Sequence, residues 1–566
     1  MFPTSLYLVG MLPWAAAWHA RLPSNGGLSK REISINTTDY PALKIDIPID
    51  HYNTSDHRTY SNRYWVRSEY YKPGGPVFYF DSGEQNAHPL VPYFLYEAAG
   101  PSSVMTLARR FNGIALIFEH RFYGDLHEGS YPFPMNSTSG MAEGGYSAYK
   151  YLNTEQALQD PVYFAHHFQP PGMEKYWSLL NPAYTPWIWL GGSYPGIRGA
   201  HMRVRNPETF YATWASSAPT EAKVDMWTYY AQYYTHVTNH VDGVLINGTQ
   251  QEISDLKYAL YKAVLSGPGG QTPTSVNRTE SDALSNASVA SYLLLPFSFY
   301  QYYGFEASVK PFCDIMETFN QTSVRTTDNG GTAAAIATES GIAISHNITA
   351  AWDAFLVGIA EIDYDSIPYH DDPIQDMSWM WQYCSEYGYY QRGNPSNPHT
   401  IQSRFESLSL FQSRCNSTFP VGLPPSPNVS EPNKYGGWHI NPSNTMFASG
   451  EYDPWRALSP ASIEAGSPNR TTLQTIPECN VAPPSDSIFG IIYRDMVHVS
   501  DMRALLNTSD VNHQNFSTVG FSSPISTEPF YAGVSLFQSA LEAWLPCFDR
   551  GSYAAMTFEF PEALVA

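Results

Sequence analysis

The chain has 566 residues, more than one ordinary hydrophobic core holds, so we expect one large domain with an inserted or second domain. Hydrophobic residues make up 43% and aromatic residues 15% of the chain, which argues against disorder on composition. The formal net charge of −21 argues against nucleic acid and against anionic membrane surfaces as partners.

The N-terminal residues are typical of an export signal. Residues 6–17 are largely apolar and end in three alanines that offer a small-residue cleavage site, so we predict a signal peptide at residues 1–17. No Lys or Arg precedes Arg21, and a buried N-terminal segment is therefore the alternative. Lys30-Arg31 is either a processing site or a pair of solvated charges. No later run is long and apolar enough to predict a membrane span.

Short apolar runs alternate with helical stretches in the first third of the chain. Residues 77–80, 114–118 and 187–190 are continuous apolar runs and predict three strands. Residues 153–167, between the last two runs, predict a helix. Continuous apolar strands interleaved with helices are typical of a parallel sheet that is covered on both faces.

The middle of the chain has a different character. Residues 222–434 are helix-like and aromatic with little strand signal, and strands are again predicted at 445–448 and 488–493. We therefore expect an α/β core formed by residues 40–221 and 435–566, interrupted by a helical cap domain at 222–434. Such an insertion would lie over the carboxyl edge of the sheet, where these folds bind ligands.

Thirteen N-x-S/T sequons are spread through the chain, and their number supports secretion because each predicts an exposed glycosylated loop or edge. The acceptors are Asn36, Asn53, Asn136, Asn247, Asn277, Asn286, Asn320, Asn347, Asn416, Asn428, Asn469, Asn507 and Asn515. Five cysteines predict two disulfides and one leftover thiol in an oxidising compartment. No CxxC or Cys/His cluster suggests a metal, and we expect no cofactor.

A candidate nucleophile follows the third predicted strand. Residues 191–196 read Gly-Gly-Ser-Tyr-Pro-Gly, and a nucleophile elbow places a serine on a tight strand-to-helix turn between small neighbours. Pro195 stands where the motif usually has glycine, but proline is tolerated in a first helical turn. Ser193 is therefore the predicted nucleophile, with an ordinary turn as the alternative.

Two later residues complete a candidate catalytic triad. Asp453 follows the predicted strand at 445–448, and His498 follows the one at 488–493. The order Ser, Asp, His is that of α/β-hydrolases, in which the histidine takes the serine proton and the acid holds the imidazole. The alternative is that Asp453 only caps a turn and that His498 is an ordinary surface histidine.

These and further segments carry a family resemblance. They are Asp50-His51-Tyr52-Asn53, Asn62-Arg63-Tyr64-Trp65, Ser82-Gly83-Glu84, residues 119–124, residues 151–157, Gly191-Gly192-Ser193-Tyr194, residues 381–386, residues 435–438, residues 451–455 and residues 498–501. Over nearly the whole mature chain the sequence resembles the serine peptidases that include prolyl carboxypeptidase, dipeptidyl peptidase II and the fungal secreted prolyl endopeptidases. The resemblance implies an α/β-hydrolase core with a helical cap, and cleavage after proline.

The resemblance also assigns roles to residues. It implies that Ser193, Asp453 and His498 are catalytic, and the geometry of the fold then gives an oxyanion hole made by the N–H of Tyr194 and a second donor from the loop at 82–84.

Further assignments concern substrate and disulfide. Trp455 would form part of the wall of a proline pocket, or is a core tryptophan. Glu84 would meet the free amino end of a substrate, or is a structural glutamate. Cys384 and Cys415 would form a family disulfide, while Cys313, Cys479 and Cys547 stay unassigned.

Three functions therefore compete. The first is a post-proline peptidase acting on proline-containing peptides, either exo- or endo-acting, in the extracellular space or in an acidic vacuolar or lysosomal-type compartment. The animal relatives often carry paired histidines near the catalytic one, whereas only His498 stands here, which weakens an exopeptidase assignment. The second is an esterase or lipase, although no HGGG-type loop is present. The third is a non-catalytic peptide-binding glycoprotein. Sequence does not predict the oligomeric state.

Overall fold

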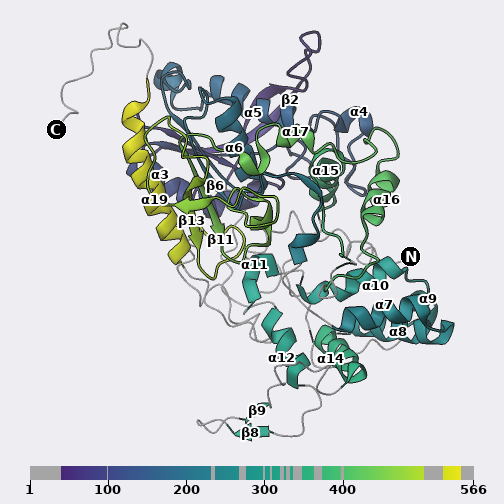
Figure 1. The fold of residues 1–566 in the computed structure, drawn as a ribbon. Coiled ribbons are helices and arrows are strands. Elements are labelled where there is room, and N and C mark those ends of the chain that lie inside the picture. The colour runs from purple at the N-terminus through teal and green to yellow at the C-terminus, as the bar shows by residue number, and fades with distance from the viewer. Residues whose placement is uncertain are drawn as a thin grey trace.

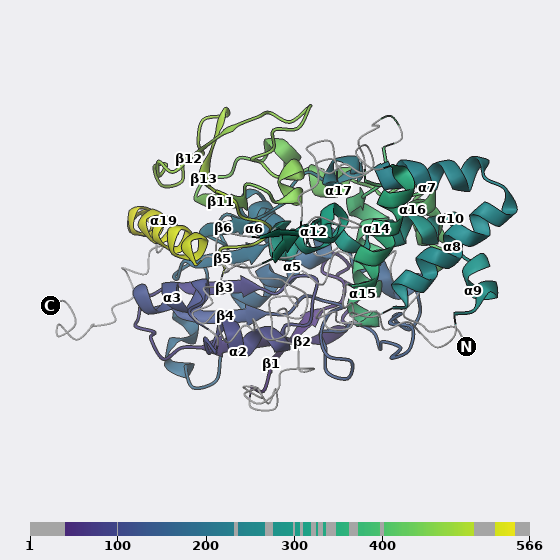
Figure 2. The ribbon, with the colours of Figure 1, turned by 90° about the horizontal axis from the view of Figure 1, so that it is seen from below.

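A nine-stranded sheet forms the centre of the protein. The computed structural model describes residues 40–98, 100–230, 236–266, 276–297, 300–305, 309–318, 324–326, 332–334, 347–361, 372–394, 396, 401–502 and 527–549. Figure 2 shows the strands in the order β1-β2-β4-β3-β5-β6-β11-β13-β12. Their bounds are β1 Leu43–Pro48, β2 Thr59–Arg67, β3 Val77–Asp81, β4 Ile114–Phe118, β5 Trp187–Gly192, β6 Ala212–Ser216, β11 Thr445–Gly450, β12 Thr471–Leu473 and β13 Ser487–Tyr493.

The sheet is mostly parallel. The seven strands from β4 to β12 in this order pair in parallel, while β2 pairs antiparallel with both β1 and β4. Every residue of β3, β4, β5, β6 and β11 is buried. The predicted parallel sheet is therefore confirmed, and the five predicted strands all exist with ends within two residues of the expected ones.

Helices cover both faces of this sheet. Figure 2 shows α3 (Ser103–Arg110) and α19 (Glu528–Trp544) on one side, and α5 (Thr154–His166) and α6 (Tyr194–Arg205) on the other. Helix α5 begins after Asn153, whose side chain accepts a hydrogen bond from the N–H of Gln156 and so satisfies one of the unpaired N–H groups of the first turn. The predicted α/β-hydrolase core is present.

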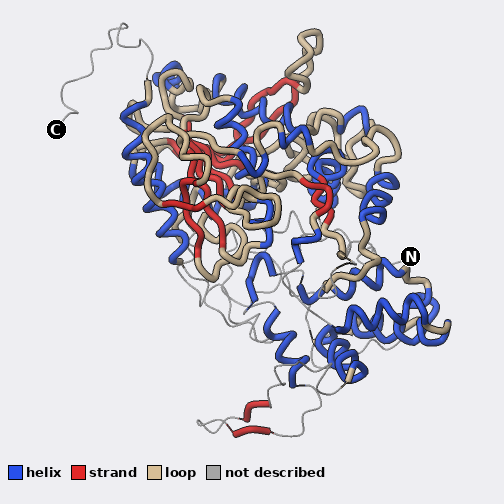
Figure 3. Tube along the Cα trace, viewed as in Figure 1, coloured by secondary structure: helices blue, strands red, loops and turns tan. Residues whose placement is uncertain are grey.

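The chain between β6 and β11 is mainly helical, as Figure 3 shows. Its helices are α7 His236–Asn247, α8 Gln250–Val264, α9 Arg278–Asp282, α10 Asn286–Leu293, α11 Tyr300–Gly304, α12 Lys310–Thr318, α14 Ile348–Ala360, α15 Pro373–Gln382, α16 Leu408–Thr418 and α17 Ser430–Asn433. In Figure 1 α7, α8, α12 and α14 lie together below the sheet. We call residues 222–434 the inserted segment; these limits, and those of the two core parts, remain a prediction.

The inserted segment also holds two short strand pairs that the sequence did not predict. The strand β7 (Lys223–Asp225) pairs in parallel with β10 (Gly388–Tyr390), so the start of the segment lies against the stretch that follows α15. The strands β8 (Val324–Thr326) and β9 (Thr332–Ala334) form an antiparallel pair.

Helix α15 fastens the inserted segment to the core. Ser378 Oγ donates to the carbonyl of Phe122 at 2.9 Å, and Trp381 Nε1 donates to the carbonyl of Leu152 at 3.0 Å. All of these atoms are buried, so the bonds form away from competing water and fix the helix on the loops that follow β4.

Two disulfides are formed. Cys384–Cys415 lies within the inserted segment, which confirms the pairing that the family resemblance implied. Cys479–Cys547 joins the chain before β13 to the short turn that follows α19. Cys313 belongs to neither bond, which settles the cysteine assignment that the sequence left open.

The predicted glycosylation sites in the described chain lie at the surface. Eight acceptors are exposed, and Asn286 is half-buried; the exposed ones are Asn53, Asn136, Asn247, Asn277, Asn347, Asn416, Asn428 and Asn469. Outside the described residues lie the signal peptide, Lys30-Arg31 and four acceptors, namely Asn36, Asn320, Asn507 and Asn515. Among the described helices, none has the length and apolar character needed to cross a bilayer.

Candidate active site

Ser193 occupies a strained turn between β5 and α6. Its backbone has φ +65° and ψ −129°, a conformation that non-glycine residues rarely adopt. The turn is tight, because a Cβ atom at Gly191 would lie 2.5 Å from the carbonyl group of Pro195. The N–H of Ser193 donates to the carbonyl of Ser216 on the neighbouring strand at 2.8 Å. This is the local geometry of a nucleophile elbow.

Pro195 fits this elbow, and its presence has a structural consequence. It lies in the first turn of α6, where a backbone N–H would have no partner within the helix. Its ring contacts Gly83 so closely that a Cβ atom at Gly83 would lie 2.2 Å from Pro195 Cγ. Proline at 195 and glycine at 83 are therefore complementary, and the loop after β3 lies directly against the elbow.

His498 and Asp453 form a buried hydrogen-bonded pair. His498 Nδ1 lies 2.9 and 3.0 Å from the two carboxylate oxygens of Asp453. The two residues are 2% and 3% exposed, so this contact is shielded from water. The carboxylate also accepts from the N–H of Trp455 at 2.9 Å, which fixes its orientation. Because Nδ1 of the imidazole is bound to the carboxylate, Nε2 is the nitrogen that can accept a proton, as a general base requires.

The sheet brings the three predicted residues to one edge. Ser193 follows β5, Asp453 follows β11 and His498 comes after β13, and these strands run parallel within one sheet. Their carboxyl ends therefore lie at the same edge, with only β6 between β5 and β11.

The loop that carries His498 is held by contacts that the sequence did not reveal. The N–H of His498 donates to the carbonyl of Gln301 in α11, and the N–H of Val499 donates to Ser217 Oγ. Gln301 lies 197 positions before His498 in the chain, so no local pattern could have signalled the contact. The inserted segment thus contacts the candidate base directly.

Asp501 anchors the same loop to the sheet. Its buried carboxylate accepts from Ser216 Oγ at 2.5 Å, from Tyr493 OH at 3.0 Å and from Trp214 Nε1 at 3.3 Å. Burial raises the pKa of Asp501, and these three neutral donors oppose that effect by stabilising the ionised form.

The comparisons with known proteins agree with this geometry. The profile of the family described as serine carboxypeptidase S28 matches residues 47–475. The chain belongs to this family. Among relatives of this S28 chain, a protein of Arthroderma benhamiae named "Probable extracellular serine carboxypeptidase" is 31% identical over 76% of this chain and 61% of its own length. The chain therefore spans less than two thirds of that relative.

Two further similarities are weaker. The human protein named "Thymus-specific serine protease" is 25% identical over 78% of this S28 chain and 82% of its own length. The crystal structure of an esterase, E22, covers 85% of this chain and 99% of its own with 9% identity and a TM-score of 0.33, which is too low to support an inference.

Trp455 of the S28 chain lies between the core and the inserted segment. It is 1% exposed, and its ring packs edge-on against Tyr229 and Tyr389, which both belong to the inserted segment. Its Nε1 donates to Gln301 Oε1 at 3.0 Å. Its ring centroid is 6.4 Å from that of His498. The tryptophan is therefore both a core residue and a neighbour of the candidate base.

Glu84 is buried beside the elbow. It is 2% exposed, and no described side chain or backbone group donates a hydrogen bond to its Oε2. Burial raises its pKa to about 8 because the charged carboxylate loses its hydration. The carboxyl is thus protonated at neutral and acidic pH when the site is empty.

The raised pKa of Glu84 makes stability depend on pH. The folded protein holds this proton up to a pH of about 8, while an unfolded chain releases it near the ordinary glutamate pKa of 4.5. The protonated carboxyl of Glu84 therefore contributes fully to the free energy of unfolding below pH 4.5. This contribution is lost as pH rises to about 8, a change on the order of 4–5 kcal/mol. We expect the wild type to lose more thermal stability than Glu84→Gln between pH 4.5 and 8.5. Parallel melting curves for the two proteins across this range would contradict the assignment.

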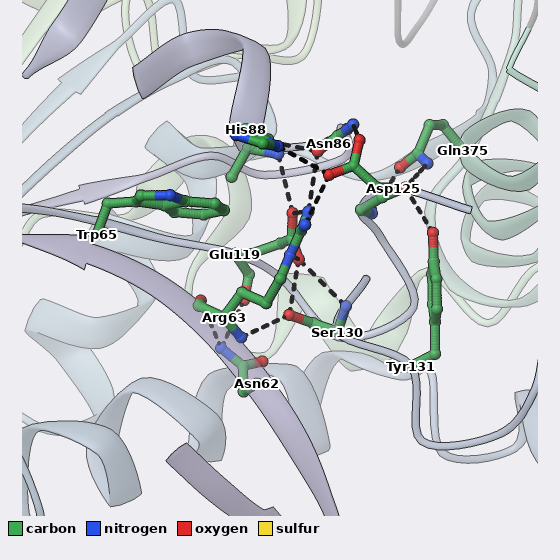
Figure 4. A network of polar contacts seen from close by, with 12 residues as sticks. Asn62, Arg63, Trp65, Asn86, His88, Glu119, Asp125, Ser130, Tyr131 and Gln375 are labelled. Atoms are coloured by element: carbon green, nitrogen blue, oxygen red, sulfur yellow. Dashed lines mark hydrogen bonds and ion pairs between the residues drawn. The ribbon is translucent and has the colours of Figure 1, made fainter. Parts of the chain in front are cut away.

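A polar network fixes the loop that carries Glu84, as Figure 4 shows. Arg63, on β2, donates to both carboxylate oxygens of Glu119 at 2.6 and 2.8 Å, to Asn86 Oδ1 at 3.0 Å and to Asp125 at 2.6 Å. Glu119 Oε1 also accepts from the N–H of Ala87 at 3.0 Å. Arg63 and Glu119 are 1% and 0% exposed. The sequence marked both within family motifs but did not predict their contact.

A second ion pair ties the same loop to α6. Arg198 Nη1 lies 2.8 and 2.7 Å from the two carboxylate oxygens of Asp81, at the end of β3. Asp81 Oδ1 also accepts from the N–H of Gly83 at 3.2 Å. Within the described chain, no group of His, Cys, Asp and Glu is arranged to hold a metal ion.

Proposed function

We propose that the protein is a secreted serine peptidase that cleaves peptides on the carboxyl side of proline. The observation that carries the proposal is the elbow serine at the same sheet edge as the buried Asp453–His498 pair. Family membership supports the serine-peptidase chemistry. Secretion is supported by the exposed sequons, the two disulfides and the printed name of the Arthroderma relative.

The chemistry assigned to the triad is acyl transfer. Ser193 Oγ attacks the carbonyl carbon of the scissile peptide bond while His498 Nε2 takes its proton. Asp453 stabilises the resulting imidazolium through its contact with Nδ1. His498 then gives the proton to the leaving amine, and an acyl-enzyme remains. Water attacks this ester with His498 again as base, which frees the product acid and Ser193.

The oxyanion of the tetrahedral intermediate needs two donors. Tyr194 is the first residue of α6, so its N–H has no partner within the helix and is our first donor. In the loop after β3, two N–H groups already have acceptors. The N–H of Ser82 donates to the carbonyl of Phe118, and the N–H of Gly83 donates to the carboxylate of Asp81. We assign the second donor to the N–H of Glu84, the remaining N–H of residues 82–84, which also interacts with its own carboxylate.

The specificity assignment rests on Trp455 and Glu84. A flat indole wall suits a pyrrolidine ring, which has no N–H to satisfy. A free amino group near Glu84 would favour the ionised carboxylate and lower its pKa, so an aminopeptidase-like substrate would bind by displacing the proton. A blocked peptide would leave Glu84 protonated.

We expect Trp455→Ala to reduce the preference for proline over alanine on the acyl side. Removing one wall of an apolar pocket is worth about 1–3 kcal/mol, or roughly 10- to 100-fold in kcat/KM for proline substrates. Trp455→Phe keeps a ring and is the matched control, since Trp455 is a buried residue whose truncation also costs stability. An unchanged ratio of kcat/KM for proline and alanine substrates in Trp455→Ala would remove Trp455 from the pocket.

The test of the function uses N-blocked, C-blocked and unblocked proline-containing peptides from pH 3 to 8, with the cleaved bonds identified by mass spectrometry. We expect cleavage after proline, and secondarily after alanine. Hydrolysis of carboxylic esters without peptide cleavage would identify an esterase, and binding without cleavage would identify a peptide-binding glycoprotein. Products from blocked and unblocked peptides distinguish endo- from exo-action.

A further inference from the structure

The side chain of Tyr194, next to the candidate nucleophile, is held by a buried chain of hydrogen bonds. Its hydroxyl lies 3.1 Å from His120 Nε2 and 2.8 Å from Gln382 Nε2. Gln382 Oε1 in turn accepts from Tyr123 OH at 2.5 Å. All four residues are at most 2% exposed, so water does not compete for these bonds.

One carbonyl group determines which partner donates in each of these hydrogen bonds. His120 Nδ1 lies 2.7 Å from the carbonyl oxygen of Arg121, which only accepts, so Nδ1 carries the proton. Burial lowers the pKa of His120 well below its ordinary value, and the neutral ring therefore presents Nε2 as an acceptor. Tyr194 OH must then donate to His120 Nε2.

The amide of Gln382 completes this pattern. Since the hydroxyl of Tyr194 donates its hydrogen bond to His120, its oxygen accepts from Gln382 Nε2. The amide oxygen then faces Tyr123 OH, which donates to it. Each bond then pairs one donor with one acceptor, and a glutamate in place of Gln382 would present an oxygen where Tyr194 needs a donor. The amide of Gln382 thus supplies a donor to Tyr194 and an acceptor to Tyr123.

Gln382 belongs to the inserted segment, whereas the other three residues belong to the core. It is the last residue of α15, the helix that Ser378 and Trp381 fasten to the core. Trp379 and Tyr387 of the same segment also pack edge-on against the ring of Tyr194. The residue that begins α6 is therefore held from the inserted segment as well as from the core.

We propose that Gln382 is a positioning residue, through which the inserted segment holds Tyr194 and so aligns the oxyanion donor beside Ser193. The inference rests on the proposed function, because the aligned group is the backbone N–H assigned above. A shift of about 1 Å in such a donor is enough for a loss on the order of 100-fold in rate. The inserted segment would thus complete the catalytic machinery in addition to restricting access to it.

The experiment compares Gln382→Leu, Tyr194→Phe and the double variant with the wild-type protein. We expect each single variant to lower kcat roughly 10- to 100-fold with KM changed less than twofold, because the donor acts on the transition state. The affinity for a peptidyl boronate, which forms a tetrahedral adduct, should fall by the same factor. The double variant should be no slower than the slower single variant, since the two substitutions break the same chain of hydrogen bonds.

Ser378→Ala is the matched control, because it removes a buried bond between α15 and the core one turn earlier without touching Tyr194. It should lower the melting temperature but leave kcat and boronate affinity unchanged. Tyr194→Phe removes a single oxygen atom and keeps the test decisive if Gln382→Leu does not fold. The proposal is overturned if kcat of Gln382→Leu or Tyr194→Phe stays within twofold of Ser378→Ala. Failure of the proposed function is separate, because the wild-type protein would then cleave no peptide.

Discussion

Ser193→Ala is expected to reduce peptide hydrolysis by a factor on the order of 10⁶. The hydroxyl is the group that attacks the scissile peptide bond in the scheme, and triad members act as a unit. The variant should fold normally, because alanine removes one oxygen atom and keeps the backbone conformation of the elbow. Residual turnover above about one per cent, in protein free of wild-type enzyme, would contradict the assignment.

The other triad members give a graded series. His498→Ala should cost nearly as much as the serine change, since Ser193 then has no base. Asp453→Ala should cost less, on the order of 10⁴-fold, because it leaves the base in place but without its partner at Nδ1. Equal losses for the three variants would mean that the acid does more than orient and stabilise the imidazole.

Glu119→Ala is expected to destabilise the protein by about 3–5 kcal/mol. It leaves the guanidinium of Arg63 buried without its main carboxylate partner, and it also removes the acceptor of the Ala87 N–H. Because Ala87 lies in the loop that carries Glu84, activity should fall together with stability. Urea unfolding measures the first effect, and kcat/KM measures the second.

An exposed ion pair on the same strand is the control. Arg67, four residues further along β2, pairs with Glu69, and both side chains are substantially exposed. Glu69→Ala should therefore change the free energy of unfolding by less than about 1 kcal/mol. If the two glutamate variants were equally stable, the buried Arg63 network would not be what holds the loop.

The parallel core could be predicted because its strands are buried on both faces. Residues 77–80 of β3 and all of β4 form unbroken apolar runs, and a parallel sheet covered on both faces buries every side chain of such a run. The antiparallel strands β1 and β2 were not predicted, because polar residues such as Lys44, Asp46 and Asn62 interrupt them. The short pairs inside the inserted segment carry too few residues for a pattern.

The position of the three candidate triad residues could be predicted because each follows a strand, so that chain order and sheet geometry together bring them to one edge. The contacts of Gln301 and Gln382 with the site could not be predicted from the sequence. They join residues that lie 197 and 188 positions from their partners His498 and Tyr194, and a lone glutamine in a helical stretch has no signature. The fit of Pro195 against Gly83 likewise appears only when two separate strands lie side by side.

The central claim, that Ser193 is an activated nucleophile, is tested most directly by locating a covalent adduct. The protein is treated with a fluorophosphonate, digested and mapped by mass spectrometry. We expect one adduct, on Ser193, and we expect labelling to fall sharply in His498→Ala because the base that activates the hydroxyl is gone. An adduct on another residue, or undiminished labelling of Ser193→Ala, would contradict the account.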